Sequence, residues 1–158
     1  MKKRWFGCLA IAFLALTAGC ATLPTQEQMA ADIAGYELPK QPTDEAALIY
    51  VVRPSGVGPI VRFNVFLDDT ADTSEMGYTR GSQYIYFFVS PGIHTIYSKA
   101  ENWGEILIDA KPRDVIFIKQ IASMGFVMAR NSLEQIQDTE GKYHVKNISL
   151  GTIKKERK

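Results

Sequence analysis

The pattern of hydrophobic and polar residues divides the chain into three parts. Residues 5–16 form an apolar run, residues 21–45 are mostly polar and contain three prolines, and the chain from residue 46 consists of short apolar segments separated by Gly, Pro and Asp. Segments rich in Ile, Val, Tyr and Phe, with turn residues about every eight to twelve positions, are typical of all-β proteins. The pattern therefore predicts one β domain behind an apolar leader and a polar connection.

The domain, residues 46–153, is expected to fold as an antiparallel β-sandwich of about seven or eight strands. After residue 138 the polar sequence predicts a closing turn or a short helix, and then a last strand near residues 146–153. The main predicted strands are residues 47–53, 62–68, 75–80, 83–89, 94–100, 105–109, 115–121 and 126–136.

The polar connection, residues 20–45, is predicted to be a tether with a short helix. Thr25 and Gln28 have the spacing of a capping box, and Met29 and Ile33 would share one face of that helix. A helix packed on the domain is the alternative. Neither arrangement suggests catalysis.

The first residues have the layout of a bacterial export signal. Lys2, Lys3 and Arg4 precede the apolar run, which ends in the sequence LTAGC at residues 16–20. This sequence resembles the lipobox of bacterial lipoproteins, although Thr17 stands where Leu is commonest. The resemblance implies that residues 1–19 are a signal peptide and that Cys20 carries acyl chains such as palmitate. An uncleaved anchor helix, or a secretory signal cut elsewhere, is the alternative.

The address of the protein follows from the same resemblance. Ala21 is not the Asp that usually retains a lipoprotein in the inner membrane, which implies the outer membrane, with the domain facing the periplasm. Two or three acyl chains are enough for stable membrane attachment. Cys8 would leave with the signal and Cys20 would be acylated, so no cysteine remains for a disulfide or a metal.

The charge balance argues against nucleic acid as a partner. The chain has 18 Lys and Arg against 17 Asp and Glu, and removal of Lys2, Lys3 and Arg4 leaves 15 against 17, a net charge of −2. A strongly basic footprint is therefore absent. The basic tail, residues 154–158, is expected to be a solvated end, with contact to anionic lipid or peptidoglycan as the alternative.

The most aromatic segment, residues 83–89, is a candidate partner-binding surface. Alternation along a strand places Tyr84, Tyr86 and Phe88 on one face. With Tyr78 and Tyr97 on nearby strands, these side chains could stack on sugar rings or on a peptide. The alternative is that they fill the interior and rim of the sandwich.

No catalytic, cofactor or metal site is predicted. His94 and His144 are the two histidines, and no Gly-x-Ser-x-Gly elbow accompanies them, so His94 is expected to be a hydrogen-bonded structural residue. Residues 68–75 contain clustered acids but lack the spacing of a calcium loop, which favours a solvated hairpin. We therefore expect a binding protein and no enzyme.

Three segments resemble a known group of proteins. ALIYVVRP at 47–54, VFLDD at 65–69 and VSPGIHTI at 89–96 are similar to small bacterial envelope lipoproteins grouped as a domain of unknown function, with a PEGA-like β-sandwich core. The hairpin after residue 68 departs from the PEGA pattern because it lacks the usual Gly. The resemblance implies an envelope lipoprotein that binds or scaffolds another envelope component, such as a protein or peptidoglycan. A cell-wall hydrolase or carbohydrate-binding module is the alternative.

Overall fold

The computed structural model describes residues 23–125 and 129–157. The elements follow one another along the chain as α1 (Gln26–Asp32), β1 (Ala47–Arg53), β2 (Phe63–Leu67), the 3₁₀ turn η1 (Asp72–Ser74), β3 (Glu75–Thr79), β4 (Gln83–Val89), β5 (Gly92–Lys99), β6 (Trp103–Ala110), β7 (Val115–Met124), β8 (Ala129–Ile136), α2 (Asp138–Asn147), β9 (Ser149–Leu150) and β10 (Thr152–Ile153).

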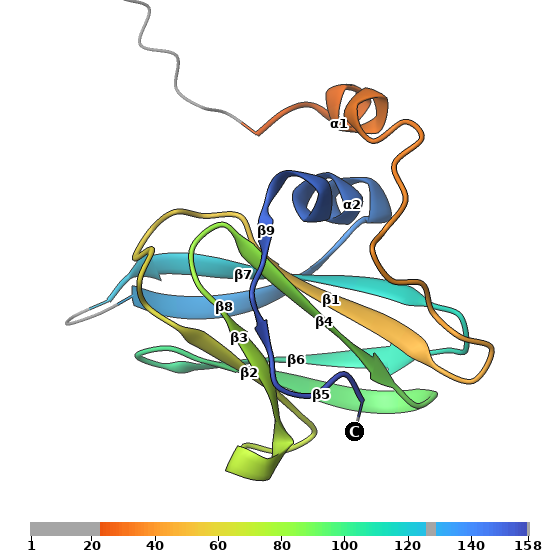
Figure 1. The fold of residues 1–158 in the computed structure, drawn as a ribbon. Coiled ribbons are helices and arrows are strands. Elements are labelled where there is room, and N and C mark those ends of the chain that lie inside the picture. Colours follow the sequence, from red (N-terminus) through yellow and green to blue (C-terminus); the bar gives the residue numbers. More distant parts are fainter. Residues whose placement is uncertain (1–22, 126–128, 158) are drawn as a thin grey trace, which may run out of the picture.

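Two five-stranded sheets pack face to face, which confirms the predicted β-sandwich (Figure 1). The first sheet has the order β8-β7-β1-β4-β9 and the second the order β10-β3-β2-β5-β6. Most neighbouring strands are antiparallel, but β1 pairs with β7, and β4 with β9, in parallel. Parallel neighbours need a long connection between them. The chain passes through β2 to β6 between β1 and β7, and through β5 to α2 between β4 and β9.

The main core lies between the two sheets. Alternate residues of β1 and β4, such as Ile49, Val51, Ile85 and Phe87, point inward and meet Val65 of β2. Every one of these side chains is fully buried. The two-residue periodicity that predicted the strands therefore also selects the inward face.

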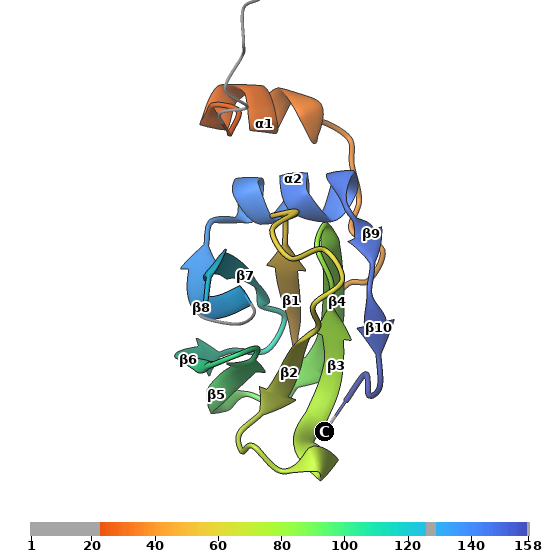
Figure 2. The ribbon, with the colours of Figure 1, turned by 90° about the vertical axis from the view of Figure 1, so that its left-hand side faces the viewer.

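A second hydrophobic core covers the outer face of the first sheet. All seven residues of β1 are buried, because Leu48, Tyr50 and Val52 point away from the main core and lie under other parts of the chain. Helix α2 contributes Val145 to this second core. Figure 2 shows α2 lying over the outer face of the first sheet, with α1 stacked on it.

Residues 23–45 pack on the domain, so the structure shows the alternative to a free tether. Helix α1 begins with the predicted capping box between Thr25 and Gln28 and buries Met29. Its last residue, Asp32, accepts a hydrogen bond from the Asn147 side chain of α2, which lowers the pKa of Asp32. Leu38 in the following segment belongs to the second core. The polar composition hid this packing because only a few apolar residues make the contact.

The C-terminal segment 149–157 runs along the sheets and is held there by hydrogen bonds, although most of its side chains are exposed. Backbone N–H groups of Lys154 and Lys155 donate to Met76 O, and the Lys154 amine pairs with the buried Glu75 carboxylate. Near the end of the chain, Phe88 N donates to Glu156 O at 2.6 Å. The side chains of residues 154–157 are exposed to solvent, as expected for the tail, but the end is not frayed, because backbone hydrogen bonds and one buried carboxylate hold it on the domain.

Candidate binding surface

The predicted partner surface on β4 lies largely inside the second core. Tyr84 and Tyr86 are each 7% exposed, and Phe88 is half-buried beneath the Arg157 guanidinium, 5.7 Å from the ring centroid. Burial raises the pKa of both tyrosine hydroxyls. These three residues therefore fill the interior and rim of the sandwich, which was the alternative to a binding surface.

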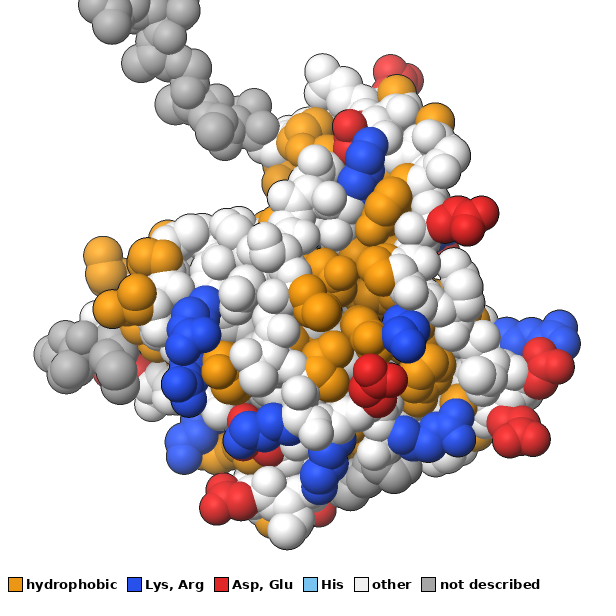
Figure 3. Space-filling view, in the orientation of Figure 1, with side chains coloured by type: hydrophobic (Ala, Val, Ile, Leu, Met, Phe, Trp, Pro, Cys, Tyr) orange, Lys and Arg blue, Asp and Glu red, His pale blue; other side chains and the backbone are white. Residues whose placement is uncertain are grey.

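Segments from both ends of the chain cover this face of β4. The hydroxyl of Tyr50, between Tyr84 and Tyr86, donates to Lys40 O at 3.0 Å and accepts from Lys40 N. Lys40 and Glu156 also face each other, 4.0 Å apart. Figure 3 shows hydrophobic side chains on this side of the molecule with charged residues lying across them.

The outer face of the second sheet carries exposed hydrophobic residues on β5 and β6. Ile93 is 70% exposed, Leu107 65% and Trp103 44%. We call these three residues the outer strip. Ile93 pairs with Asp109, and Thr95 pairs with Leu107, so Ile93 and Leu107 are diagonal neighbours on one face. Among the described residues, no other element covers this face.

Aromatic residues fix one end of the outer strip. The Trp103 ring lies 5.3 Å from that of the buried Phe66 and 6.5 Å from that of Tyr97, in tilted and edge-on contacts. The Lys99 amine lies 5.1 Å from the Trp103 centroid. A tryptophan held on several sides while part of its ring faces solvent is already ordered for binding.

The outer strip was not among the residues predicted from the sequence. Strand β6 alternates between Ile106 and Ile108, which face the main core, and Leu107, which faces solvent. A strand with apolar residues on both of its faces is a sequence pattern that can indicate an exposed apolar surface. Strand β4 shows the same pattern with aromatic residues, and it was therefore chosen as the candidate surface. The four tyrosines that were predicted to form one stacking surface lie on different sheets. Tyr84 and Tyr86 are on the first sheet, and Tyr78 and Tyr97 are on the second.

His94 forms hydrogen bonds that connect parts of the fold. Its Nδ1 lies 2.9 Å from Asp68 Oδ1, and its Nε2 lies 2.8 Å from Ser90 O. The ring thus ties β5 to the connection after β2 and to the turn before β5. Both nitrogens are engaged by acceptors, whereas a general base needs a nitrogen directed at a nucleophile or substrate.

His144 is a buried residue of α2 and lies beside the ion pair between Lys119 and Glu140. Its Nε2 lies 3.5 Å from Glu140 Oε1, and the same carboxylate oxygen accepts a hydrogen bond from the Lys119 amine at 2.7 Å. Burial lowers the pKa of His144, the Glu140 carboxylate opposes this change and the Lys119 charge adds to it. The cluster joins α2 to β7.

The acidic residues after β2 serve the local backbone. Asp68 binds His94, Asp69 Oδ1 accepts from Ala71 N at 3.0 Å, and Glu75 is buried against Asn64 and Lys154. Within residues 23–125 and 129–157, no group of three His, Cys, Asp or Glu side chains could hold a metal ion.

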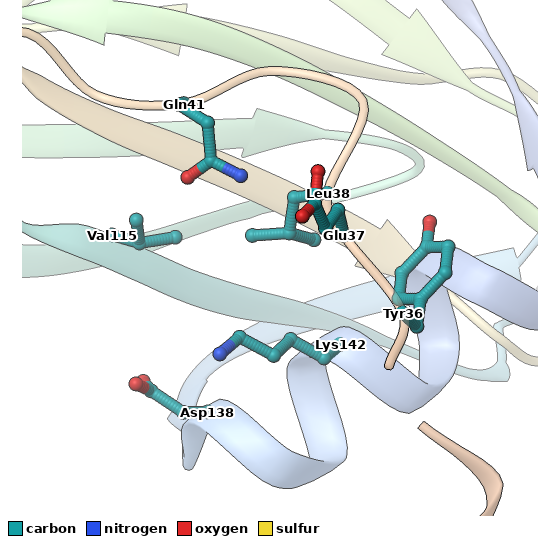
Figure 4. A pocket seen from close by; sticks show the side chains of 7 residues that line it. All are labelled: Tyr36, Glu37, Leu38, Gln41, Val115, Asp138 and Lys142. Carbon is teal, nitrogen blue, oxygen red and sulfur yellow. The ribbon is translucent and has the colours of Figure 1, made fainter. Parts of the chain in front are cut away.

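Three cavities have volumes of about 260, 220 and 270 Å³, below the roughly 300–1,000 Å³ of typical ligand pockets. The first lies between the segment after α1, β7 and α2, and Figure 4 shows Lys142 and Asp138 at one side of it, facing Val115 and Leu38. His144 lines the third cavity, together with Leu23, Pro24, Pro54, Tyr143, Asn147 and Ile148. The outer strip is therefore a better candidate site than any of these cavities.

Cys20, the predicted lipidation site, lies outside the described residues, as does the whole of residues 1–19. In the part of the chain that the structure does describe, no helix is long and apolar enough to cross a membrane.

Comparison with known proteins gives a distant relative. No family model matches the chain. An uncharacterized protein of Haemophilus influenzae is 22% identical over 136 residues, which cover 85% of this chain and 77% of that protein. The chain is thus similar along most of its length to this uncharacterized protein.

Proposed function

We propose that the protein is a lipid-anchored lipoprotein of the bacterial outer membrane that faces the periplasm and binds another envelope component. The basic start, the apolar run and the sequence LTAGC ending at Cys20 support the anchor. Removal of residues 1–19 would leave Cys20 as the first residue, acylated on sulfur and on its amino group. The packed domain begins only a few residues later, so the anchor would hold it close to the membrane.

The outer strip is the observation that carries the binding role. Ile93, Trp103 and Leu107 expose apolar side chains on a sheet face, and the aromatic contacts beneath Trp103 hold its ring in place. Aromatic residues that are preordered and exposed are typical anchors of protein interfaces. The partner we propose is an envelope protein with a complementary apolar surface.

Binding fits the described residues better than hydrolysis. His94 is engaged on both nitrogens, and His144 is buried against Glu140. The cavity that His144 lines has no acidic residue in its lining. A cell-wall hydrolase would instead bring His94 or His144 together with acidic residues in one open cleft. The first cavity is lined by Glu37 and Asp138 but by no histidine.

Site-specific photo-cross-linking in intact cells tests the binding role. A photoreactive amino acid at Leu107 should capture one discrete partner. The matched control places it at Leu150, which is 51% exposed but lies on β9. The Cys20→Ala variant should lose the adduct, because the domain would leave the membrane. Equal adducts at both positions, or none at Leu107, would contradict the proposal.

Carbohydrate binding is the second candidate, because an exposed Trp103 beside Tyr97 could also stack on a sugar ring. Co-sedimentation with purified peptidoglycan separates the two. Binding that is lost in Trp103→Ala but kept in Ile93→Ser would favour the carbohydrate. Absence of co-sedimentation together with a protein adduct at Leu107 would favour the envelope protein.

A further inference from the structure

One end of the sandwich combines exposed apolar side chains from two separate connections. Residues 54–62 join β1 to β2, and β7 ends at Met124, at the same end of the molecule in both views (Figures 1 and 2). Val57 is 45% exposed, Ile60 82% and Met124 89%. Hydrophobic side chains project at this end in Figure 3. We call these three residues the apolar tip.

The connection that presents Val57 and Ile60 is held firmly. The buried Arg53 guanidinium donates from Nη1 to Val61 O at 2.7 Å, and from Nη2 to Val57 O at 2.7 Å and to Gly58 O at 3.0 Å. Its carbon lies 3.6 Å from the centroid of the Phe63 ring. Burial lowers the pKa of Arg53 to about 10, so the side chain stays charged at neutral pH. The apolar side chains are therefore displayed on an ordered loop.

Basic residues flank the apolar tip. Arg62 and Arg130 are exposed, and Arg80 is half-buried. The guanidinium carbons of Arg62 and Arg80 lie 4.6 and 5.2 Å from the Tyr78 ring centroid. Residues 54–62 and 80–82 contain no Asp or Glu, whereas the connection 68–74 contains three Asp. The turn between β5 and β6, which Asn102 joins to Asn131 beside Arg130, contains Glu101. Apolar residues flanked by arginine suit a surface that is both apolar and anionic.

The start of the described chain lies near this end. Leu23 and Pro24 line the same cavity as Pro54, the residue that follows β1 and begins the loop with Val57 and Ile60. Cys20 precedes Leu23 by three residues, which span at most about 10–11 Å when fully extended. An acylated Cys20 would therefore keep Pro54 and its loop close to the bilayer.

We propose that the apolar tip is a second membrane contact. Val57, Ile60 and Met124 insert among the headgroups of the bilayer that holds the anchor, and Arg62, Arg80 and Arg130 bind the phosphates of anionic phospholipids. This inference rests on the proposed lipidation of Cys20. It fixes the orientation of the domain, since the tip faces lipid while the outer strip stays accessible to a partner.

An environment-sensitive dye on a single introduced cysteine tests the contact. The purified lipoprotein with Ile60→Cys is labelled with a nitrobenzoxadiazole dye in vesicles of phosphatidylethanolamine and phosphatidylglycerol. Ile93→Cys is the matched control, because Ile93 is also a well-exposed isoleucine but belongs to the outer strip. We expect a shift to shorter emission wavelength, and quenching by nitroxide-labelled lipid, at position 60 and neither at position 93.

The charge contribution is measured with the same label. Arg62→Gln together with Arg130→Gln should reduce the shift and the quenching at position 60, and so should replacement of phosphatidylglycerol by phosphatidylcholine. If position 60 is as exposed to water as position 93 while the protein stays on the vesicles, the proposal is wrong. Shielding of position 60 in cells but not in lipid vesicles would also overturn it, in favour of a protein partner.

Failure of the anchor gives a different result. The chain without an introduced cysteine should not react with the dye, because Cys8 is removed and Cys20 is acylated. Labelling of that chain, or unchanged flotation of Cys20→Ala with vesicles, would contradict the lipidation proposal itself. The two failures are thus distinguishable.

Discussion

The two sheets differ in what lies on their outer faces. The outer face of the first sheet carries Tyr50, Tyr84, Tyr86 and Phe117, and is covered by α2 and by segments before β1 and after β8. The outer face of the second sheet carries the outer strip, which stays exposed. The more hydrophobic face is the less accessible one. A strand with aromatic residues therefore indicates a strand buried on both faces as readily as it indicates a binding surface.

The covering of the first sheet suggests a division of roles. The N-terminal and C-terminal segments seal the second core, and this leaves the second sheet as the open face. If the covered face serves stability and the open face serves binding, substitutions on the two faces should affect different measurements.

Truncation of Phe117 should cost the most stability. Its ring is buried and lies 5.5 Å from that of Tyr50 in a stacked contact. Phe117→Ala is expected to lower the free energy of unfolding by about 3–5 kcal/mol, because it leaves a cavity in the second core. Urea denaturation measures the change.

Leu107→Ala is the matched control on the open face, and its effect should stay within about 0.5 kcal/mol because the side chain is exposed. Similar losses for Phe117→Ala and Leu107→Ala would remove the distinction between the two faces.

A methyl group on Gly141 should destabilise the contact between α2 and the first sheet. A Cβ at this position would lie 2.1 Å from Phe117 Cγ. Gly141→Ala should therefore lower the free energy of unfolding by about 1–3 kcal/mol, although alanine ordinarily stabilises a helix by about 1 kcal/mol relative to glycine.

A thermodynamic cycle identifies the cause of this loss. Addition of Phe117→Leu to Gly141→Ala should cost less than the sum of the two single changes, because the smaller side chain relieves the overlap. Lys142→Ala, at the next position of α2, should have little effect on stability. A gain in stability from Gly141→Ala alone would show that the helix does not press on the sheet.

The smallest expected effect is a dependence of the covered face on pH. Burial lowers the pKa of His144 below its ordinary value of 6.5, with the Glu140 carboxylate and the Lys119 amine facing it. The unfolded chain therefore binds a proton more readily than the folded one as the pH falls below 6.5, and stability decreases. At higher pH both states are neutral at this residue and the penalty disappears.

Unfolding in urea at about pH 7.5 and about pH 5.5, on either side of the ordinary histidine pKa, measures this dependence. His144→Gln should reduce the loss of stability on acidification. Tyr143→Phe, a neighbouring change that leaves the imidazole in place, should keep it. An unchanged pH dependence in His144→Gln would contradict the role of burial at this residue.

Much of the secondary structure could be predicted from the sequence because strand periodicity is local. The predicted segment 47–53 coincides with β1, and the segment 83–89 with β4. The capping box of Thr25 and Gln28 also forms. Capping residues and alternating side chains depend on neighbours a few positions away, so they can be recognised without the fold.

The exposed apolar face could not be predicted from the sequence, because exposure depends on distant parts of the chain. Tyr86 is buried partly through Glu156, which is 70 positions away in sequence and approaches its hydroxyl to 3.3 Å. Leu107 has the same apolar character but no such cover among the described residues. The periodicity of a strand carries no information about which distant segment of the chain packs on that strand.

The sequence by itself determined that the domain is a β-sandwich, because many short strands with alternating apolar residues and no long helix between them bury their apolar side by packing sheet against sheet. Only the tertiary structure decided which outer face became a second core. The physical reason is that Leu38, Val145 and the segment 149–157 reach the first sheet through contacts between residues far apart in the chain. Those contacts leave Ile93, Trp103 and Leu107 as the open surface of the domain.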